Sequence, residues 1–162
     1  MFFIIFFILV AVINSTKDDI TKDLFDPEDS FHKKNLELQD VRYSEMFDVE
    51  PEDENHFSNA YSVFQKLQLT TEIILLDLKH NHPSKTRLRH IWRSVNNLIF
   101  NIIKNLFIEL SHQQLPRAEP LTRSLIPRYF RCVHHSSYRD VRDFVILKHV
   151  LEEAKTYLNV FD

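Results

Sequence analysis

The 162-residue chain contains no glycine, and this absence constrains its fold more than any other feature of the sequence. Glycine adopts positive φ angles without steric cost. The Asn-Gly and Asp-Gly turns that close tight β-hairpins are therefore missing, and a many-stranded sheet is disfavoured. Gly-rich phosphate loops, dinucleotide-binding fingerprints and the glycine-flanked nucleophile turn of hydrolases are excluded. The sequence predicts helices joined by polar and proline-containing loops.

Residues 88–110 carry the clearest helical pattern. Their apolar side chains recur every three or four residues, which places them on one wide face of a helix. These residues are Leu88, Ile91, Trp92, Val95, Leu98, Ile99, Ile102, Ile103, Leu106, Phe107 and Leu110. The other face carries arginine, asparagine, lysine and glutamate, so we expect this helix to pack against other helices in a bundle.

Two further segments repeat this spacing. One predicts a helix over residues 55–80, and the other predicts a last helix whose apolar positions run from 141 to 161. Residues 81–84 form so short a connection that the helices on either side are antiparallel neighbours, with Ser84 as the N-cap of the second. Residues 113–127 contain three prolines and predict a crossover with one short helical turn at 121–126.

The first part of the chain has a different character. Residues 1–15 are predicted to be a secretory signal peptide, because their apolar run is shorter than the about 20 residues that span a bilayer. No Lys or Arg precedes this run, so an uncleaved anchor or a buried N-terminal strand stays an alternative. Residues 16–54 form an acidic lead-in with a weaker helical pattern at 31–47, in which Leu36, Tyr43 and Phe47 face inward.

Residues 55–162 are predicted to form a helical bundle domain. We expect an all-α fold, a small bundle of three to four helices without disulfides, in an up-down or a cytokine-like topology. Cys132 is the only cysteine, so no internal disulfide can form. It is either a buried small hydrophobe or, in an oxidising compartment, the site of an intermolecular disulfide in a homodimer.

No catalytic, cofactor or metal site is predicted. The nine histidines lack the spacing of known zinc sites, and no two of them lie four residues apart. Cys132 lies near His134 and His135, but a thiolate nucleophile also needs a group that orients its base and an oxyanion site. We therefore expect a protein that binds its partner without catalysis.

Charge is distributed unevenly along the sequence. Residues 17–55 have a net charge of −9, from 14 acidic and 5 basic side chains, whereas residues 79–142 have a net charge of +9, from 12 basic and 3 acidic. Basic groups near a helix N-terminus oppose the helix dipole, so folding does not explain all of them. The arginines that we predict to bind a partner are Arg87, Arg93, Arg128, Arg131, Arg139 and Arg142.

Three interpretations of these basic residues stay open. They suit a protein receptor with an acidic surface, a glycosaminoglycan or other anionic surface, or neutralisation by the acidic segment of the same chain. Nucleic acid is not expected, because the whole chain has a formal net charge of −3 and the first residues predict secretion.

The sequence Arg128-Tyr129-Phe130-Arg131, followed by Ser137-Tyr138-Arg139-Asp140-Val141-Arg142 and an amphipathic helix, resembles the C-terminal part of secreted helical cytokines. Type I interferons and the interleukin-10 group are similar over the last 35 residues. Their paired disulfides, and the cysteine and tryptophan of the last interferon helix, are missing. The resemblance implies a secreted helical bundle that acts through exposed helix faces.

These observations predict a secreted, cytokine-like signalling or interaction protein that binds a protein receptor through a basic face formed by helix and crossover residues. The alternative is an extracellular helical lipid carrier, which the 14 phenylalanines and the long apolar stripes favour. A third interpretation is a membrane-tethered or self-associating structural protein.

Overall fold

The computed structural model describes residues 2–24, 30–47, 55–116 and 119–161, and these contain helices but no β-strand. The long helices are α1 (Phe2–Leu24), α2 (Ser30–Phe47), α3 (His56–Asn81), α4 (Thr86–His112) and α6 (Ser136–Val160). The 3₁₀ helix η1 (Arg123–Leu125) and α5 (Arg128–Arg131) are short. The prediction of an all-α bundle is confirmed, and α1 adds a further long helix to it.

Helix α4 presents its predicted apolar face to the core. The side chains of this face without exposed surface are Trp92, Val95, Ile99, Ile102, Leu106 and Leu110. Burying an aliphatic side chain of this size contributes about 1.5–3 kcal/mol, so this face is a major source of stability. At the edge of the predicted stripe, Phe107 remains 39% exposed.

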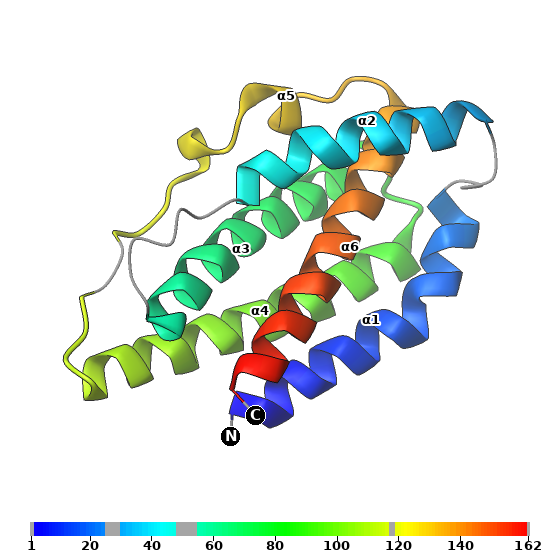
Figure 1. Cartoon of the computed structure of the whole chain (residues 1–162). Coiled ribbons are helices and arrows are strands. Elements are labelled where there is room, and N and C mark those ends of the chain that lie inside the picture. The colour runs from blue at the N-terminus through cyan, green and yellow to red at the C-terminus, as the bar shows by residue number, and fades with distance from the viewer. Residues whose placement is uncertain (1, 25–29, 48–54, 117–118, 162) are drawn as a thin grey trace.

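Helices α3 and α4 form the antiparallel pair that the short connection predicts (Figure 1). Helix α3 begins where the Asn55 side chain accepts hydrogen bonds from the backbone N–H groups of Phe57 and Ser58, at 2.9 and 3.3 Å. The N-cap of α4 is Lys85, so the prediction of Ser84 is wrong. The Lys85 N–H donates to the carbonyl of His82, and this turn delays the helix start by one residue.

Helix α6 occupies the centre of the bundle, where it contacts α1, α2 and α3 (Figure 1). Its predicted inward residues Val141, Leu147 and Ala154 are buried. Because helices cover it on several sides, Ile146 and Val150 are buried as well, outside the single face that the spacing indicated. Because of this central position, two charged residues of α6, Arg142 and Asp143, are buried inside the bundle.

Helices α1 and α2 pack against this core. In α1, Phe6, Leu9 and Ile13 are buried against α4 and α6, and the helix continues beyond residue 15 to Leu24. A single helix thus runs across residue 15, the predicted end of the signal peptide. The signal peptide itself stays a prediction. In α2, the predicted inward residue Tyr43 is buried.

Phe47 of α2 is buried too, and Leu36 packs against the core while remaining half-buried, so the predicted inward face of 31–47 is confirmed. The predicted lead-in lies partly outside the described residues, at 25–29 and 48–54.

The segment after α4 is the predicted crossover. It returns along the bundle through η1 and α5, so that α6 runs in the same general direction as α4 (Figure 1). The predicted turn at 121–126 is present as η1. In α5, Phe130 is buried and lies against Tyr43 of α2, with ring centroids 5.3 Å apart, which fixes the crossover to the bundle.

Candidate binding surfaces

A basic groove of about 350 Å³ lies between α3 and α4. Its lining residues are Glu72, Leu75, Leu76, Lys79, Arg89, Arg93 and Arg123. Because α3 and α4 are antiparallel, the later turns of α3 lie opposite the first turns of α4, and η1 adds Arg123. We call this site the basic groove.

Positive charge in the basic groove is only partly neutralised. Arg123 forms an ion pair with Glu72 at 3.2 Å, and the Arg89 guanidinium donates to the backbone carbonyl of Pro83 at 3.0 Å. Within the described part of the chain, Lys79 and Arg93 pair with no carboxylate. The groove therefore carries a net positive charge at its surface.

The structure does not bring the six predicted arginines together on one face. Arg93 lies in the basic groove, whereas Arg87 lines a separate open hollow between α1 and α4, beside Val12. Arg128 and Arg131 are exposed on α5.

Arg139 lies at the start of α6, half-buried and close to the connection between α3 and α4. Burial, with Lys85 and Arg139 as smaller causes, lowers the pKa of His82 in that connection. Arg139 thus contributes to the electrostatics of the loop end of the bundle.

Arg142 has no exposed surface, so its prediction as a partner-binding residue is wrong. Its Nη2 lies 2.7 Å from Asp77 Oδ2 and 2.8 Å from Asp143 Oδ1, and its Nη1 donates to the carbonyl of Phe130 at 3.1 Å. Burial opposes the charged form of Arg142, but the two carboxylates outweigh it and raise the pKa. Arg142 therefore joins α3, α5 and α6 from inside.

Arg142 is buried beside an aromatic ring. Its guanidinium carbon lies 5.2 Å from the centre of the Phe130 ring. Burial raises the pKa of Asp143 to about 6 and the pKa of Tyr43 to about 12. The sequence does indicate this burial, because Val145 and Ile146, three and four residues after Arg142, are apolar and lie on the same face of the helix.

Cys132 is exposed, so the prediction of a buried small hydrophobe is wrong. It follows the single turn of α5, from which only Phe130 is buried, and its N–H donates to the carbonyl of Arg128. The thiol is therefore open to solvent. Its pairing with a second chain stays a prediction.

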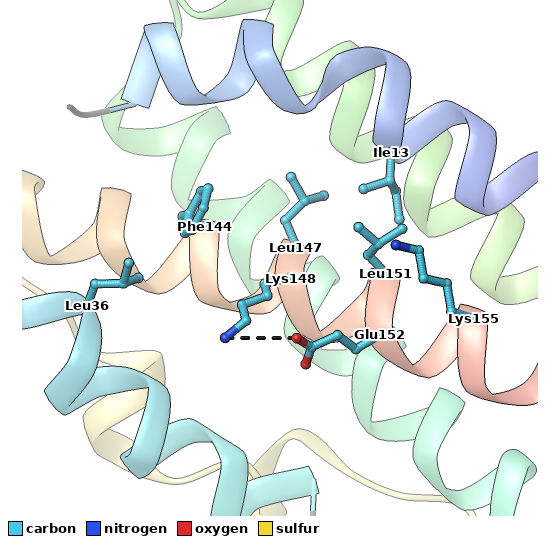
Figure 2. A pocket seen from close by; sticks show the side chains of 8 residues that line it. All are labelled: Ile13, Leu36, Phe144, Leu147, Lys148, Leu151, Glu152 and Lys155. Carbon is cyan, nitrogen blue, oxygen red and sulfur yellow. Dashed lines mark ion pairs between the residues drawn. The ribbon is translucent and has the colours of Figure 1, made fainter. Parts of the chain in front are cut away.

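A second groove, of about 390 Å³, lies over α6 between α1 and α2. We call it the apolar groove. Its apolar lining consists of Ile13, Leu36, Phe144, Leu147 and Leu151, and its rim carries Lys148, Glu152 and Lys155 (Figure 2). Sequence reasoning did not find this site, because three separate helices must come together to form it.

The two lysines at the rim of the apolar groove differ in their carboxylate partners. On the side of α2, Lys148 lies 2.8 Å from Asp40 and 3.9 Å from Glu152, and these contacts raise its pKa, the hydrogen bond to Asp40 most of all. Towards α1, Lys155 has no carboxylate partner among the side chains that the structure describes. Positive charge is thus uncompensated at one end of the groove.

Two further kinds of feature, a metal site and a membrane-spanning helix, are absent from the described residues. Where the structure describes side chains, no three His, Cys, Asp or Glu residues gather to hold a metal ion. None of the described helices has the length and apolar character needed to cross a bilayer. Comparison with models of protein families, with curated proteins and with solved structures finds no match to this chain.

Proposed function

We propose that the protein is a secreted helical-bundle signalling or interaction protein that binds an acidic, partly apolar segment of a protein receptor through the basic groove. The observation that carries this proposal is the set of four cationic side chains around a groove whose lining, among the described residues, includes one carboxylate, that of Glu72. Leu76, which is 38% exposed, offers apolar contact beside these charges. The mechanism is recognition without chemistry.

The position of these charges supports binding over a role in folding. Helix α4 has no acidic residue in its first turn, where a carboxylate stabilises the helix dipole, and it carries Arg87, Arg89 and Arg93 in its first turns. Arginine is enriched among the residues that dominate binding energy at protein interfaces. Such charges, costly for the isolated helix, are favourable opposite an acidic partner.

Charge reversal in the basic groove tests the proposal. Lys79→Glu and Arg93→Glu together change two surface residues from facing helices, and Lys34→Glu with Lys104→Glu, at two exposed lysines outside the groove, is the control matched in charge. The probe is a fluorescent synthetic peptide of alternating glutamate and leucine. We expect the double variant to bind about tenfold more weakly, with the control unchanged and helicity preserved. Equal affinity of the double variant and the control would reject the basic groove.

The same variants separate a receptor from a glycosaminoglycan. If a sulfated polysaccharide is the partner, heparin retention falls by the same amount for the double variant and for the control, because both lose two positive charges and recognition is then mainly electrostatic. If the groove binds a peptide, Leu76→Ser weakens peptide binding and leaves heparin retention unchanged. If Leu76→Ser leaves peptide binding unchanged as well, the result favours the glycosaminoglycan.

Secretion needs its own test, the intact mass of the protein released into the medium of expressing cells. A product that begins near Ser15 to Lys17 supports secretion after signal cleavage. Such a product lacks the buried residues Phe6, Leu9 and Ile13, so it keeps the lining of the basic groove but loses part of the lining of the apolar groove. Retention of residues 1–13 contradicts signal cleavage, and no release at all contradicts secretion.

The apolar groove supports a second candidate function, an extracellular carrier of lipids that keeps residues 1–13, because Ile13 lines the groove. Its volume of about 390 Å³ falls within the range of about 300–1,000 Å³ typical of small-molecule sites. Its apolar lining with charged groups at the rim suits a ligand that has a chain and a polar head.

A further inference from the structure

We propose that the apolar groove binds a single-chain amphiphile with an anionic head, such as a fatty acid carboxylate, and that Lys155 contacts the head. This inference rests on the lipid-carrier proposal and names the ligand class of that site. It is independent of the receptor-binding proposal, which concerns the basic groove on the other helices.

The geometry of α6 sets the direction of the ligand. Phe144, Leu147, Leu151 and Lys155 follow one another at intervals of three and four residues and therefore lie along one side of α6. In Figure 2 the Lys155 side chain bends back toward Leu151 and Ile13, over the end of the apolar lining. A head group at Lys155 directs its chain over Leu151 and Leu147 toward Phe144 and Leu36.

The length of this path limits the chain. From Lys155 to Phe144 the helix rises about 16 Å, at about 1.5 Å per residue. Because the Lys155 side chain bends back toward Leu151, this rise is an upper limit for the path. An extended covalent chain advances about 1.2 Å per bond, so the groove takes at most about 12 to 14 carbons. The groove volume lies near the lower limit for ligand sites, so one chain fits better than the two chains of a phospholipid.

The charges of the rim select the head group. Glu152 is turned toward Lys148, and the Lys148 ammonium is already held by Asp40 at 2.8 Å (Figure 2). Lys155, which has no carboxylate partner in the described part of the chain, remains available to an anion. A cationic head at the same end would meet like charge, and an uncharged head would gain no ion pair.

The test measures binding of sodium octanoate, decanoate, dodecanoate and tetradecanoate to the intact chain by calorimetry, below their micellar concentrations. Each methylene that enters the groove should tighten binding up to about fourfold, until the groove is filled, at tetradecanoate at the latest. Dodecanol is the uncharged comparison. No dependence on chain length would overturn the groove as a lipid site, and the carrier function with it.

Substitution at each end tests the orientation. Lys155→Met should weaken dodecanoate binding about two- to fivefold, the range of a surface ion pair, and leave dodecanol unchanged. Lys104→Met, an exposed lysine on α4, is the matched control and should change neither. Leu36→Trp narrows the far end and should move the optimum to a shorter chain, which a merely destabilising change would not do.

Two outcomes separate this inference from the function on which it rests. If dodecanol binds as tightly as dodecanoate and Lys155→Met has no effect, recognition of an anion is refuted, while a lipid-carrier function survives. If dodecanoate binds as expected but the loaded protein does not deliver it to phosphatidylcholine vesicles, the site stands and the carrier function is rejected.

Discussion

Replacing Arg142 with methionine should destabilise the fold more than any exposed arginine could. The guanidinium is buried between Asp77 and Asp143, and its removal leaves the buried carboxylate of Asp143 without its main partner. Breaking a buried ion pair from one side costs about 3–5 kcal/mol. Natural domains have about 5–15 kcal/mol of stability in total, so Arg142→Met should remove a large share of it.

Urea unfolding followed by far-ultraviolet circular dichroism measures this loss directly, because the described chain is helical. Arg139→Met, on the same helix but half-buried, is the matched control and should cost less than about 1 kcal/mol. The double variant Arg142→Met/Asp143→Leu removes both buried charges and should recover most of the loss, since apolar replacements of buried pairs are often tolerated.

The dependence of this loss on pH gives a second readout. At about pH 5 the carboxyl of Asp143 in the variant binds a proton and no longer needs the guanidinium, so the loss should be smaller than at about pH 8. A loss no greater than that of Arg139→Met would show that Arg142 does not hold the helices together. If the double variant does not recover its stability, the loss comes from the Phe130 carbonyl, which has lost its donor, or from a cavity at position 142.

Three further predictions concern Asp143, the start of α3 and Cys132. Because burial raises the pKa of Asp143 from 3.8 to about 6, its contribution to stability is fully present below the unfolded-state pKa and is lost as the pH rises through about 6. Asp143→Asn should therefore flatten the pH dependence of the free energy of unfolding in this range, and an unchanged slope contradicts the assignment. Asn55→Ala should cost about 1 kcal/mol in urea unfolding, because two N–H groups at the start of α3 lose their acceptor. The control Asn97→Ala, at an exposed helical position, should cost less. Cys132 should react with a thiol-specific reagent in the folded protein almost as fast as in urea, since it is exposed, and strong protection would show that the thiol is covered.

Periodicity in the sequence was sufficient to predict the part of the core that α2, α3, α4 and α6 form, but not the buried residues of α1, which lie in the predicted signal peptide. The spacing of Trp92, Ile99 and Leu106 follows the helix repeat, and burial of such residues depends little on which helix covers them. The same reasoning located α3, α6 and the inward side of α2. It predicts the N-cap of α4 at Ser84, whereas the structure has this N-cap at Lys85, one residue later. Turn geometry determines a helix boundary more closely than periodicity does.

The sites were harder to predict than the core. Arg142 is predicted to bind a partner because folding does not explain the basic residues of this part of the sequence. Arginine is rarely buried, and here its partners Asp77 and Asp143, one of them on another helix, make its burial favourable. Arg93 was placed on a binding surface, but its neighbours in the basic groove, Lys79 and Arg123, come from other elements. The grouping of side chains from different helices depends on how the helices pack, which the spacing along one helix does not contain.

The contact between α1 and α6 has a consequence for the order in which the chain assembles. Phe6 lies against Phe64 and Phe161, with ring centroids 5.4 and 6.0 Å apart, so an aromatic cluster connects the first helix to the last. The contacts between α3 and α4 close a short loop and carry a small entropic cost, whereas α1 and α6 are separated by most of the sequence. During synthesis, the earliest apolar helix emerges long before its α6 partner exists. The apolar side chains of α1 that face α6 therefore remain uncovered by it until the last helix of the bundle has been made.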